Sequence, residues 1–369
     1  MKITAISVYK KALRYDRGAY VWGRGNVIEV GMSTVVVIDT DAGLSGCGEF
    51  CPCGDNYMVA HQEGTEAAAK LLAPVLLGED PRQLSRIEQL MDNTVLGHGY
   101  AKAAIDAACW DILGKATNQP VWMLLGGKLI DGAPMYRPAP QKAPEEMVAE
   151  MDILRADGYR QFQIKVGGDW QTDIERIRAT VGVLQPGEKA LADANQGWRV
   201  DEALKVARAT RYLDYLMEQP CHSYEECLQV RRRIDIPMKL DECVTGMAMA
   251  QRIVADRAAE TACLKISNLG GLSKARRVRD FFVDNRIPVV PEDTWGGEIT
   301  TAVISHFAAS TPADFLVNTT DLHSYNLEPT GTPAPRTQEG LLFASDAPGL
   351  GVKPDYRSLG NPVAQYGNA

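Results

Sequence analysis

The chain has 369 residues, of which 45% are hydrophobic and 23% are charged, and its formal net charge is −8. This composition is ordinary for a globular protein that is large enough for two domains. The acidic balance gives no reason to expect nucleic acid or an anionic membrane as a partner. No apolar run reaches the ~20 residues that a membrane span needs. Residues 1–9 alternate like a strand and lack the apolar core of a signal peptide, so a cytoplasmic location is expected.

The first 126 residues are expected to form an α+β domain. Residues 1–50 favour an antiparallel meander, because β-branched runs are separated by turn residues. Residues 15–26 and 51–57 are expected to be loops, and the pattern turns helical after residue 61. The run 101–114 predicts an amphipathic helix that ends at Gly114. Strands followed by helices are typical of an α+β arrangement.

Residues 127–321 alternate between short apolar runs and helical stretches. Five of the runs end in charged residues about 25 residues apart, which is close to the length of a βαβ unit; these residues are Lys165, Asp193, Glu218, Asp241 and Lys265. The alternation predicts a parallel barrel whose last strand covers residues 315–318. Each charged residue would lie at the carboxyl end of a strand, where such barrels carry their active sites. Residues 322–369 are expected to pack back on the first domain.

Three carboxylates at successive strand ends would converge on one point and repel one another, which raises their pKa values. Mg²⁺ would resolve this repulsion, because it prefers oxygen ligands and keeps coordination positions open for water or substrate. The expected ligands are Asp193, Glu218 and Asp241. The alternative is that each acid caps a helix or pairs with a surface arginine. This alternative is less favoured for three acids at the ends of consecutive strands.

Lys165 and Lys265 lie on the second and sixth strands of the predicted barrel, so they would face each other across the mouth. A lysine near other cations, or partly desolvated, has a lowered pKa and can act as a base. Two such groups suit proton abstraction next to a carboxylate, with a metal-stabilised enediolate. A metal-dependent aldolase or hydrolase would instead have histidine among the ligands or a Schiff-base lysine in an apolar pocket, and none of the five histidines falls at a strand end of the periodic set. A non-catalytic scaffold would not need two lysines and three acids at regularly spaced strand ends.

These residues and their flanking motifs resemble the enolase superfamily, in particular its muconate-lactonizing subgroup. The supporting stretches are Asp193-Ala194-Asn195-Gln196-Gly197-Trp198, Asp241-Glu242-Cys243-Val244 and Lys265-Ile266-Ser267-Asn268-Leu269-Gly270-Gly271. The resemblance implies an α/β fold, a modified (β/α)7β TIM-type barrel with an α+β capping domain. It also implies Lys165 and Lys265 as catalytic residues, with Mg²⁺ as cofactor. One departure is Gln163, which stands where the subgroup usually has the first lysine of a Lys-x-Lys pair.

The stretch 291–298, at the end of the next strand, bears on the substrate. Members of the subgroup that act on amino-acid-like substrates use an acid at this position to pair with a substrate ammonium, which implies that role for Asp293; Trp295 could add a cation–π face. A helix N-cap is the alternative role of this aspartate. Tyr20, Trp22 and Tyr57, on two loops of the capping domain, would close over the substrate.

The stretch resembles the branch of the family that acts on proline derivatives. The resemblance implies dehydration of cis-3-hydroxy-L-proline to a pyrroline-2-carboxylate. The alternative is racemisation or epimerisation at C2 of proline betaine or 4-hydroxyproline betaine with the same lysine pair. Overall likeness favours the dehydratase. Relatives are commonly homo-oligomers, so a homo-oligomer is expected.

Overall fold

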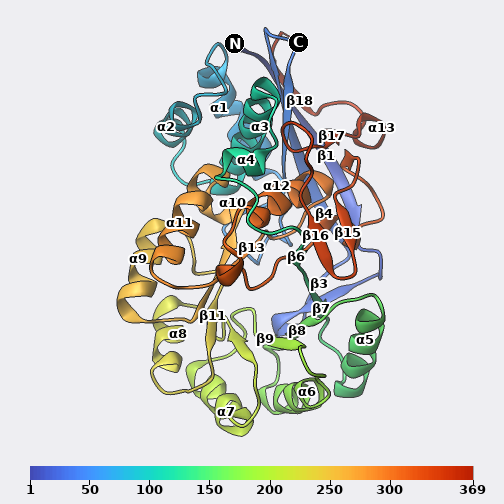
Figure 1. Ribbon diagram of the computed structural model, residues 1–369, viewed down its shortest axis with the longest axis vertical. Coiled ribbons are helices and arrows are strands. Elements are labelled where there is room, and N and C mark those ends of the chain that lie inside the picture. Colours follow the sequence, from blue (N-terminus) through green and yellow to red (C-terminus); the bar gives the residue numbers. More distant parts are fainter. Residues whose placement is uncertain (369) are drawn as a thin grey trace.

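The computed structural model describes residues 1–368 and separates into two regions. Figure 1 shows an antiparallel sheet with helices at one end of the long axis and a ring of parallel strands surrounded by helices at the other. Both termini lie on the antiparallel sheet, at the end of the molecule farthest from the ring (Figure 1). The first and last parts of the chain therefore form one capping region.

The capping sheet has the strand order β18-β1-β4-β5. Its strands are β1 (Ile3–Arg14), β4 (Val30–Thr40), β5 (Ser45–Phe50) and β18 (Ala364–Gly367). The antiparallel pairs β1–β4 and β4–β5 form the expected meander, and β18 pairs with β1 from the far end of the chain. The C-terminal segment thus lies on the sheet formed by the N-terminal residues.

A short hairpin interrupts the segment 15–26, so the prediction of a loop is wrong in part. The hairpin pairs β2 (Tyr20–Trp22) with β3 (Asn26–Ile28) around the 3-10 turn η1 (Gly23–Gly25). Tyr20 and Trp22 are both buried, whereas Val21 between them is partly exposed. Burial of alternate aromatic side chains stabilises a strand pair, which outweighs the glycine content.

The helices of the capping region follow β5. They are α1 (Gly64–Leu76), α2 (Leu84–Thr94), α3 (Gly99–Thr117) and α4 (Val121–Leu124). Helix α3 is buried on nearly all sides and continues past Gly114, so the prediction of an amphipathic helix ending there is wrong. It packs against β5, where a Cβ on Gly48 would lie 1.9 Å from the Ala104 carbonyl oxygen. Such close contact leaves no solvent face on that side.

Seven parallel strands form the ring, each hydrogen-bonded to the next in chain order. They are β7 (Tyr136–Ala139), β8 (Gln161–Lys165), β9 (Lys189–Asp193), β10 (Leu216–Glu218), β11 (Met238–Leu240), β12 (Thr261–Lys265) and β13 (Val289–Glu292). The helices between and after them are α5 (Pro144–Ala156), α6 (Trp170–Gly182), α7 (Val200–Thr210), α8 (Tyr224–Arg231), α9 (Met247–Asp256), α10 (Ile266–Leu269), α11 (Leu272–Asp284) and α12 (Glu298–Ala309).

The eighth position of the ring is closed by an extended segment rather than by a regular strand. After the 3-10 turn η2 (Ala313–Phe315), Leu316 bridges to Val289 and Thr319 bridges to Met135. The expected strand 315–318 therefore takes its predicted place but forms only isolated bridges. The predicted (β/α)7β barrel with an α+β capping domain is confirmed.

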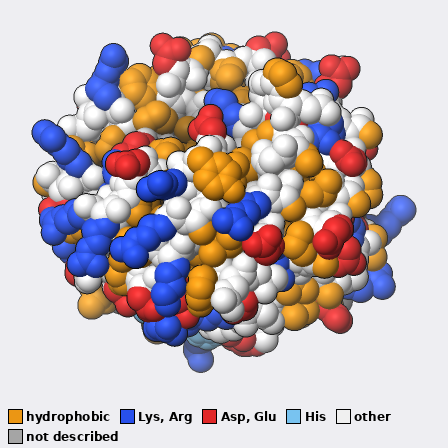
Figure 2. All heavy atoms as spheres, turned by 90° about the horizontal axis from the view of Figure 1, so that it is seen from below, with side chains coloured by type: hydrophobic (Ala, Val, Ile, Leu, Met, Phe, Trp, Pro, Cys, Tyr) orange, Lys and Arg blue, Asp and Glu red, His pale blue; other side chains and the backbone are white. Residues whose placement is uncertain are grey.

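Short elements carry the chain from the barrel back to the capping sheet. They are β6 (Ala133–Pro134), η3 (Leu322–Tyr325), β14 (Gly331–Thr332), β15 (Arg336–Gln338), β16 (Leu341–Phe343), β17 (Lys353–Pro354) and α13 (Tyr356–Leu359). Among residues 1–368, the helices are too short or too polar to cross a membrane. On the face opposite the termini, Lys and Arg side chains gather toward one side, with acidic and apolar side chains among them (Figure 2).

The strand register positions the site. Lys165 pairs with Asp193, which in turn pairs with Glu218, and Lys265 pairs with Glu292. Residues in register on adjacent parallel strands project to the same face of the sheet. These five side chains therefore share one level at the carboxyl ends of the strands.

Candidate active site

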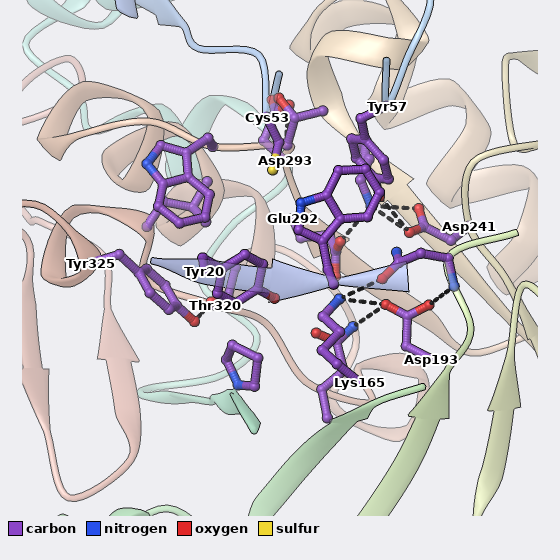
Figure 3. Close-up of a pocket in the computed structure, with 18 of the residues that line it drawn as sticks. Tyr20, Cys53, Tyr57, Lys165, Asp193, Asp241, Glu292, Asp293, Thr320 and Tyr325 are labelled. Atoms are coloured by element: carbon purple, nitrogen blue, oxygen red, sulfur yellow. Dashed lines mark hydrogen bonds and ion pairs between the residues drawn. The ribbon is translucent and has the colours of Figure 1, made fainter. Parts of the chain in front are cut away.

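A pocket opens at the carboxyl ends of the barrel strands, beneath the loops of the capping region. The predicted site residues that line it are Tyr20, Trp22, Tyr57, Lys165, Asp193, Asp241, Lys265, Asp293 and Trp295. Glu218, the remaining predicted residue, is fully buried and is joined to the pocket through Gln163, whose amide donates to its carboxylate. Figure 3 shows Asp193 and Asp241 on one side of the pocket and the rings of Tyr20 and Tyr325 on the other.

Lys165 lies at the end of β8, and its ammonium has two hydrogen-bond acceptors. Its Nζ is 2.5 Å from Asp193 Oδ2 and 3.2 Å from Asn195 Oδ1. Asn195 has a left-handed backbone with φ of 42°, and its own N–H donates to Asp193 Oδ1 at 2.8 Å. The turn after β9 thus folds back over its own strand end and places both acceptors beside Lys165.

Lys265, at the end of β12, lies between two carboxylates. Its Nζ is 2.6 and 2.5 Å from the two oxygens of Asp241 and 2.8 Å from Glu292 Oε1. Asp241, Glu292 and Cys263 offer ligand atoms within 4.8 Å of one another, the kind of group that could hold a cation. The Lys265 ammonium contacts all three, since Cys263 Sγ lies 3.8 Å from Nζ. Lys265 therefore provides the positive charge within this group.

Two of the predicted metal ligands, Asp193 and Glu218, share a hydrogen-bond donor, whereas the third, Asp241, contacts Lys265. Asp193 Oδ2 and Glu218 Oε2 each accept a hydrogen bond of 3.1 Å from the side-chain amide of Gln163. Asp241 turns toward Lys265 and accepts a 3.3 Å hydrogen bond from the Tyr57 hydroxyl. Gln163 thus joins two of the acids as a neutral donor.

The site holds more buried carboxylates than lysines, and the pKa values reflect this excess. Burial and the neighbouring charge of Asp193 raise the pKa of Glu218 to about 7. Burial and the charge of Asp241 raise the pKa of Glu242 to about 8. Because an added positive charge would relieve this repulsion, the donor set fits a divalent cation held by carboxylate oxygens.

The lysines differ from the expectation that their pKa values are lowered. Burial lowers the pKa of Lys165, but Asp193 together with Tyr20 and Glu218 more than offsets the effect of burial, and the resulting pKa is above the ordinary value. The pKa of Lys265 is likewise raised, because Asp241, Cys263 and Glu292 together outweigh the effect of burial. Both lysines are therefore ammonium groups when only these carboxylates surround them.

Asp293 lines the pocket, but its oxygens already accept hydrogen bonds. The backbone N–H of Ser267 donates to Oδ2 at 3.0 Å, and the N–H of Thr294 donates to Oδ1 at 2.8 Å. The Ser267 hydroxyl also donates to Oδ1. Asp293 thus ties β13 to the first turn of α10, which follows Lys265 directly. Burial raises the pKa of Asp293 to about 6.

Aromatic side chains form the wall opposite the acids. Trp295 is only 5% exposed, and its ring lies 5.6 Å from that of Tyr20 and 5.5 Å from that of Tyr325. Its indole N–H donates to Asn326 at 2.8 Å. Trp22 and Tyr57, from the two capping loops, pack edge to face at 4.9 Å. The hairpin and the second loop therefore meet over the pocket, as the sequence predicts for loops that close it.

Three buried side chains of the site are absent from the sequence prediction: Tyr136, Lys239 and Glu292. The Tyr136 hydroxyl donates to Glu292 Oε2 at 2.9 Å, and Lys239 Nζ lies 2.7 Å from Glu218 and 3.6 Å from Glu292. Burial raises the pKa of Glu292, but Lys265 and Lys239 lower it to about 2, so it is ionised. One sequence signal could have revealed Lys239: it is a charged residue inside an apolar strand, Met238-Lys239-Leu240.

Comparison with known proteins agrees with this geometry. Residues 146–358 match the model of the family described as enolase C-terminal domain-like. Residues 26–126 match that of the mandelate racemase/muconate lactonizing enzyme N-terminal domain.

Several known proteins are similar over nearly the whole chain. A cis-3-hydroxy-L-proline dehydratase from Roseibium aggregatum is 46% identical over 99% of this chain and 100% of its own. A crystal structure of a mandelate racemase/muconate lactonizing enzyme from Roseovarius nubinhibens has 67% identity and a TM-score of 0.97, and covers 100% of this chain and 99% of that one.

A second structure from Roseovarius nubinhibens, described as complexed with magnesium, has 35% identity and a TM-score of 0.96 and covers both chains completely. The predicted family and fold are thereby confirmed. The chain is an enzyme and belongs to the enolase superfamily.

Proposed function

We propose that this enzyme dehydrates cis-3-hydroxy-L-proline to a pyrroline-2-carboxylate. The observation that carries the proposal is the pair Lys165 and Lys265, whose ammonium groups line one pocket from strands β8 and β12. The full-length likeness to a cis-3-hydroxy-L-proline dehydratase supports the choice of substrate.

The stereochemistry of this substrate suits two groups on opposite faces. The C3 hydroxyl lies on the same face of the ring as the carboxylate and therefore opposite the C2 hydrogen. One lysine in its neutral form takes the C2 proton, and the C2–H electron pair forms the C2=C3 bond. The C3–O bond breaks, and the other lysine, as the ammonium, gives the leaving oxygen a proton so that water departs. Positioned acid and base groups of this kind contribute about 10²- to 10⁴-fold to a rate.

Enzymes of the enolase superfamily use Mg²⁺, and we propose Asp193, Glu218 and Asp241 as its ligands here. When bound, Mg²⁺ would supply positive charge to the substrate carboxylate and reduce the negative charge that holds both lysines protonated. Gln163 keeps Asp193 and Glu218 directed toward each other through its two amide contacts. Its neutral amide adds no further positive charge beside Lys165.

The remaining pocket residues suit a small cationic ring. Tyr20, Trp295 and Tyr325 present an aromatic wall, which favours a ring that carries an ammonium group. We propose that Asp293 faces the substrate ammonium while Ser267 and Thr294 hold its carboxylate in place. Trp22 and Tyr57 would then cover the ring and exclude water from the proton transfers.

A second candidate reaction uses the same lysines. If the substrate has no leaving group at C3, the second lysine can return a proton to C2 from the opposite face, which inverts that centre. The likeness to an N-succinyl-L-Arg/Lys racemase from Bacillus cereus, 33% identical over 74% of this chain, favours keeping this alternative. Its substrate here would be proline betaine or 4-hydroxyproline betaine.

Proton NMR in D₂O with Mg²⁺ separates the two reactions. With cis-3-hydroxy-L-proline we expect the C3 carbinol signal to disappear as a pyrroline carboxylate forms, and we expect no reaction in Lys265→Ala or Lys165→Ala. Deuterium entry at C2 of 4-hydroxyproline betaine with inversion, and no reaction of the first compound, would make the enzyme an epimerase. No reaction with either compound would contradict the assignment of a proline derivative.

The homo-oligomeric state and the cytoplasmic location of the protein stay predictions.

A further inference from the structure

The two reactive lysines each donate to oxygen atoms of two side chains, and the second of these side chains differs between the lysines. Lys165 contacts the carboxylate of Asp193 and the amide oxygen of Asn195. Lys265 contacts the carboxylates of Asp241 and Glu292. Asp193 and Asp241 are the proposed Mg²⁺ ligands, so their oxygens are shared with the cation in the working enzyme. Beyond these, Lys165 keeps Asn195, and Lys265 keeps Glu292 and the more distant sulfur of Cys263.

The carboxylate of Glu292 is held in one orientation by several contacts, which charge neutralisation alone would not require. It is 3% exposed, on a strand, and in register with Lys265 itself. Its Oε1 accepts from Lys265, while its Oε2 accepts from the Tyr136 hydroxyl at 2.9 Å and lies 3.6 Å from Lys239 Nζ. Contacts from β7, β11 and β12 therefore hold the carboxylate from three directions, and rotation away from Lys265 would break all of them.

We propose that Glu292 is a positioning residue that holds Lys265, and not Lys165, in its reactive place. The inference rests on the proposed function, because it assumes proton transfer by both lysines and Mg²⁺ at Asp241. A displacement of about 1 Å in a reacting group can cost about 100-fold in rate. Loss of the contact between Glu292 and Lys265 should therefore slow proton transfer on the face of the substrate next to Lys265, and leave the rate of proton transfer on the other face unchanged.

The test compares the two lysines within one protein. L-proline and D-proline have no leaving group at C3 and present the C2 proton from opposite faces, so deuterium exchange at C2 of each reports one lysine. Lys165→Ala and Lys265→Ala assign the enantiomers to the lysines. In Glu292→Gln we expect the Lys265-dependent exchange to fall about 100-fold, while the Lys165-dependent exchange stays within about threefold. Asn195→Ala should give the opposite pattern.

A smaller change guards against a misfolded variant. Tyr136→Phe removes only the hydroxyl that donates to Glu292, and a hydrogen bond of about 1 kcal/mol corresponds to about fivefold. We expect this loss in the Lys265-dependent exchange alone. An equal loss on both faces, or no loss in either variant, would overturn the proposal, because a merely structural role would not distinguish the two faces.

A second measurement does not depend on turnover. Acetic anhydride at a limiting dose, followed by peptide mass spectrometry, reports the accessibility of each lysine amine with and without Mg²⁺. We expect Glu292→Gln to raise labelling of Lys265 several-fold and to leave Lys165 unchanged; unchanged labelling of Lys265 would overturn the proposal. If the wild-type enzyme does not dehydrate cis-3-hydroxy-L-proline and exchanges neither proline enantiomer, but the labelling changes as expected, the proposed function fails while the positioning of Lys265 by Glu292 holds.

Discussion

The mouth of the barrel and the seam between barrel and capping region both bury charged side chains, but they hold them differently. We define the seam by three acids, Glu49, Asp106 and Asp111, and by the neutral His306, all buried where the barrel helices and the C-terminal segment meet the capping region. Glu49 accepts from the backbone N–H of Gly297 and of Thr300, both at 2.9 Å. At the mouth, by contrast, carboxylates face lysines and one another.

This contrast separates stability from function. In the seam, backbone donors from distant elements satisfy each carboxylate, so each acid joins parts of the chain that are far apart. At the mouth, carboxylates crowd beyond what Lys165, Lys239 and Lys265 neutralise, and the pKa of Glu218 rises to about 7. Strained or uncompensated charge is common at functional sites and costs stability. Mutations in the two regions should therefore have opposite signatures.

The largest expected effect is loss of activity from a change at the mouth. Glu218→Gln keeps the size of the side chain but removes one proposed Mg²⁺ ligand charge, and we expect activity to fall about 10³-fold, as for loss of a principal electrostatic group. In the metal-free protein the same change relieves the repulsion from Asp193 but also removes the carboxylate 2.7 Å from the buried Lys239, which keeps Glu292 at 3.6 Å as a partner. Because these two effects oppose each other, the free energy of unfolding should change by less than about 1 kcal/mol. Steady-state assays and urea titration in EDTA measure both, with the exposed Glu225→Gln as control. A strongly destabilised variant would contradict the comparison.

In the seam, Asp111→Asn should have the reverse signature. Asp111 is fully buried and accepts from the backbone N–H of Cys47 at 3.1 Å and of Leu350 at 2.9 Å, and from Lys115 Nζ at 2.7 Å. An amide would turn a donor toward one of these donors, and we expect a loss of about 3 kcal/mol in the free energy of unfolding. The rate per folded molecule should be unchanged. Asp131→Asn, at an exposed position, is the matched control.

Mg²⁺ should stabilise the wild-type protein through the mouth alone. At a free concentration about 100 times its dissociation constant, one bound ion adds about 2.7 kcal/mol to the free energy of unfolding. Thermal unfolding with and without Mg²⁺ measures this gain. We expect the gain to be retained in Asp111→Asn and to be largely lost in Glu218→Gln at the same concentration. Equal gains in both variants would remove Glu218 from the proposed ligand set.

The smallest effect concerns pH. His306 is fully buried and neutral, since its Nδ1 accepts from the Trp122 N–H and its Nε2–H donates to the Leu350 carbonyl, both at 3.1 Å. Burial lowers its pKa from 6.5 to about 4. Below about pH 6.5 the unfolded chain binds a proton that the folded protein does not, so stability falls as pH decreases toward 4.

Between pH 7 and pH 5 this one histidine should account for about 2 kcal/mol of lost stability. His306→Gln removes the titration, so its free energy of unfolding should depend less steeply on pH than that of the wild-type protein over this range. Urea titrations at several pH values measure the difference, with the exposed His61→Gln as control. Parallel curves for His306→Gln and the wild-type protein would contradict the buried neutral state.

The sequence by itself determined the barrel and the residues at its mouth. Lys165, Asp193, Glu218, Asp241 and Lys265 recur at βαβ intervals, and parallel strands bring their carboxyl ends to one rim, so spacing along the chain becomes proximity in space. The loop that carries Tyr57 was also predictable, whereas Tyr20 and Trp22 stand in strand β2 of a hairpin that the sequence pattern did not indicate.

Only the tertiary structure decided the partner of each charged group. Glu292 beside Lys265, Lys239 beneath Glu218, and Asp293 bound to Ser267 depend on strand register and on neighbours more than twenty residues away. The same holds for α3, whose burial on nearly all sides comes from packing against β5. A local sequence pattern indicates which side chains are buried or polar. The direction of a pKa shift depends on which charges surround the group, and folding alone determines that.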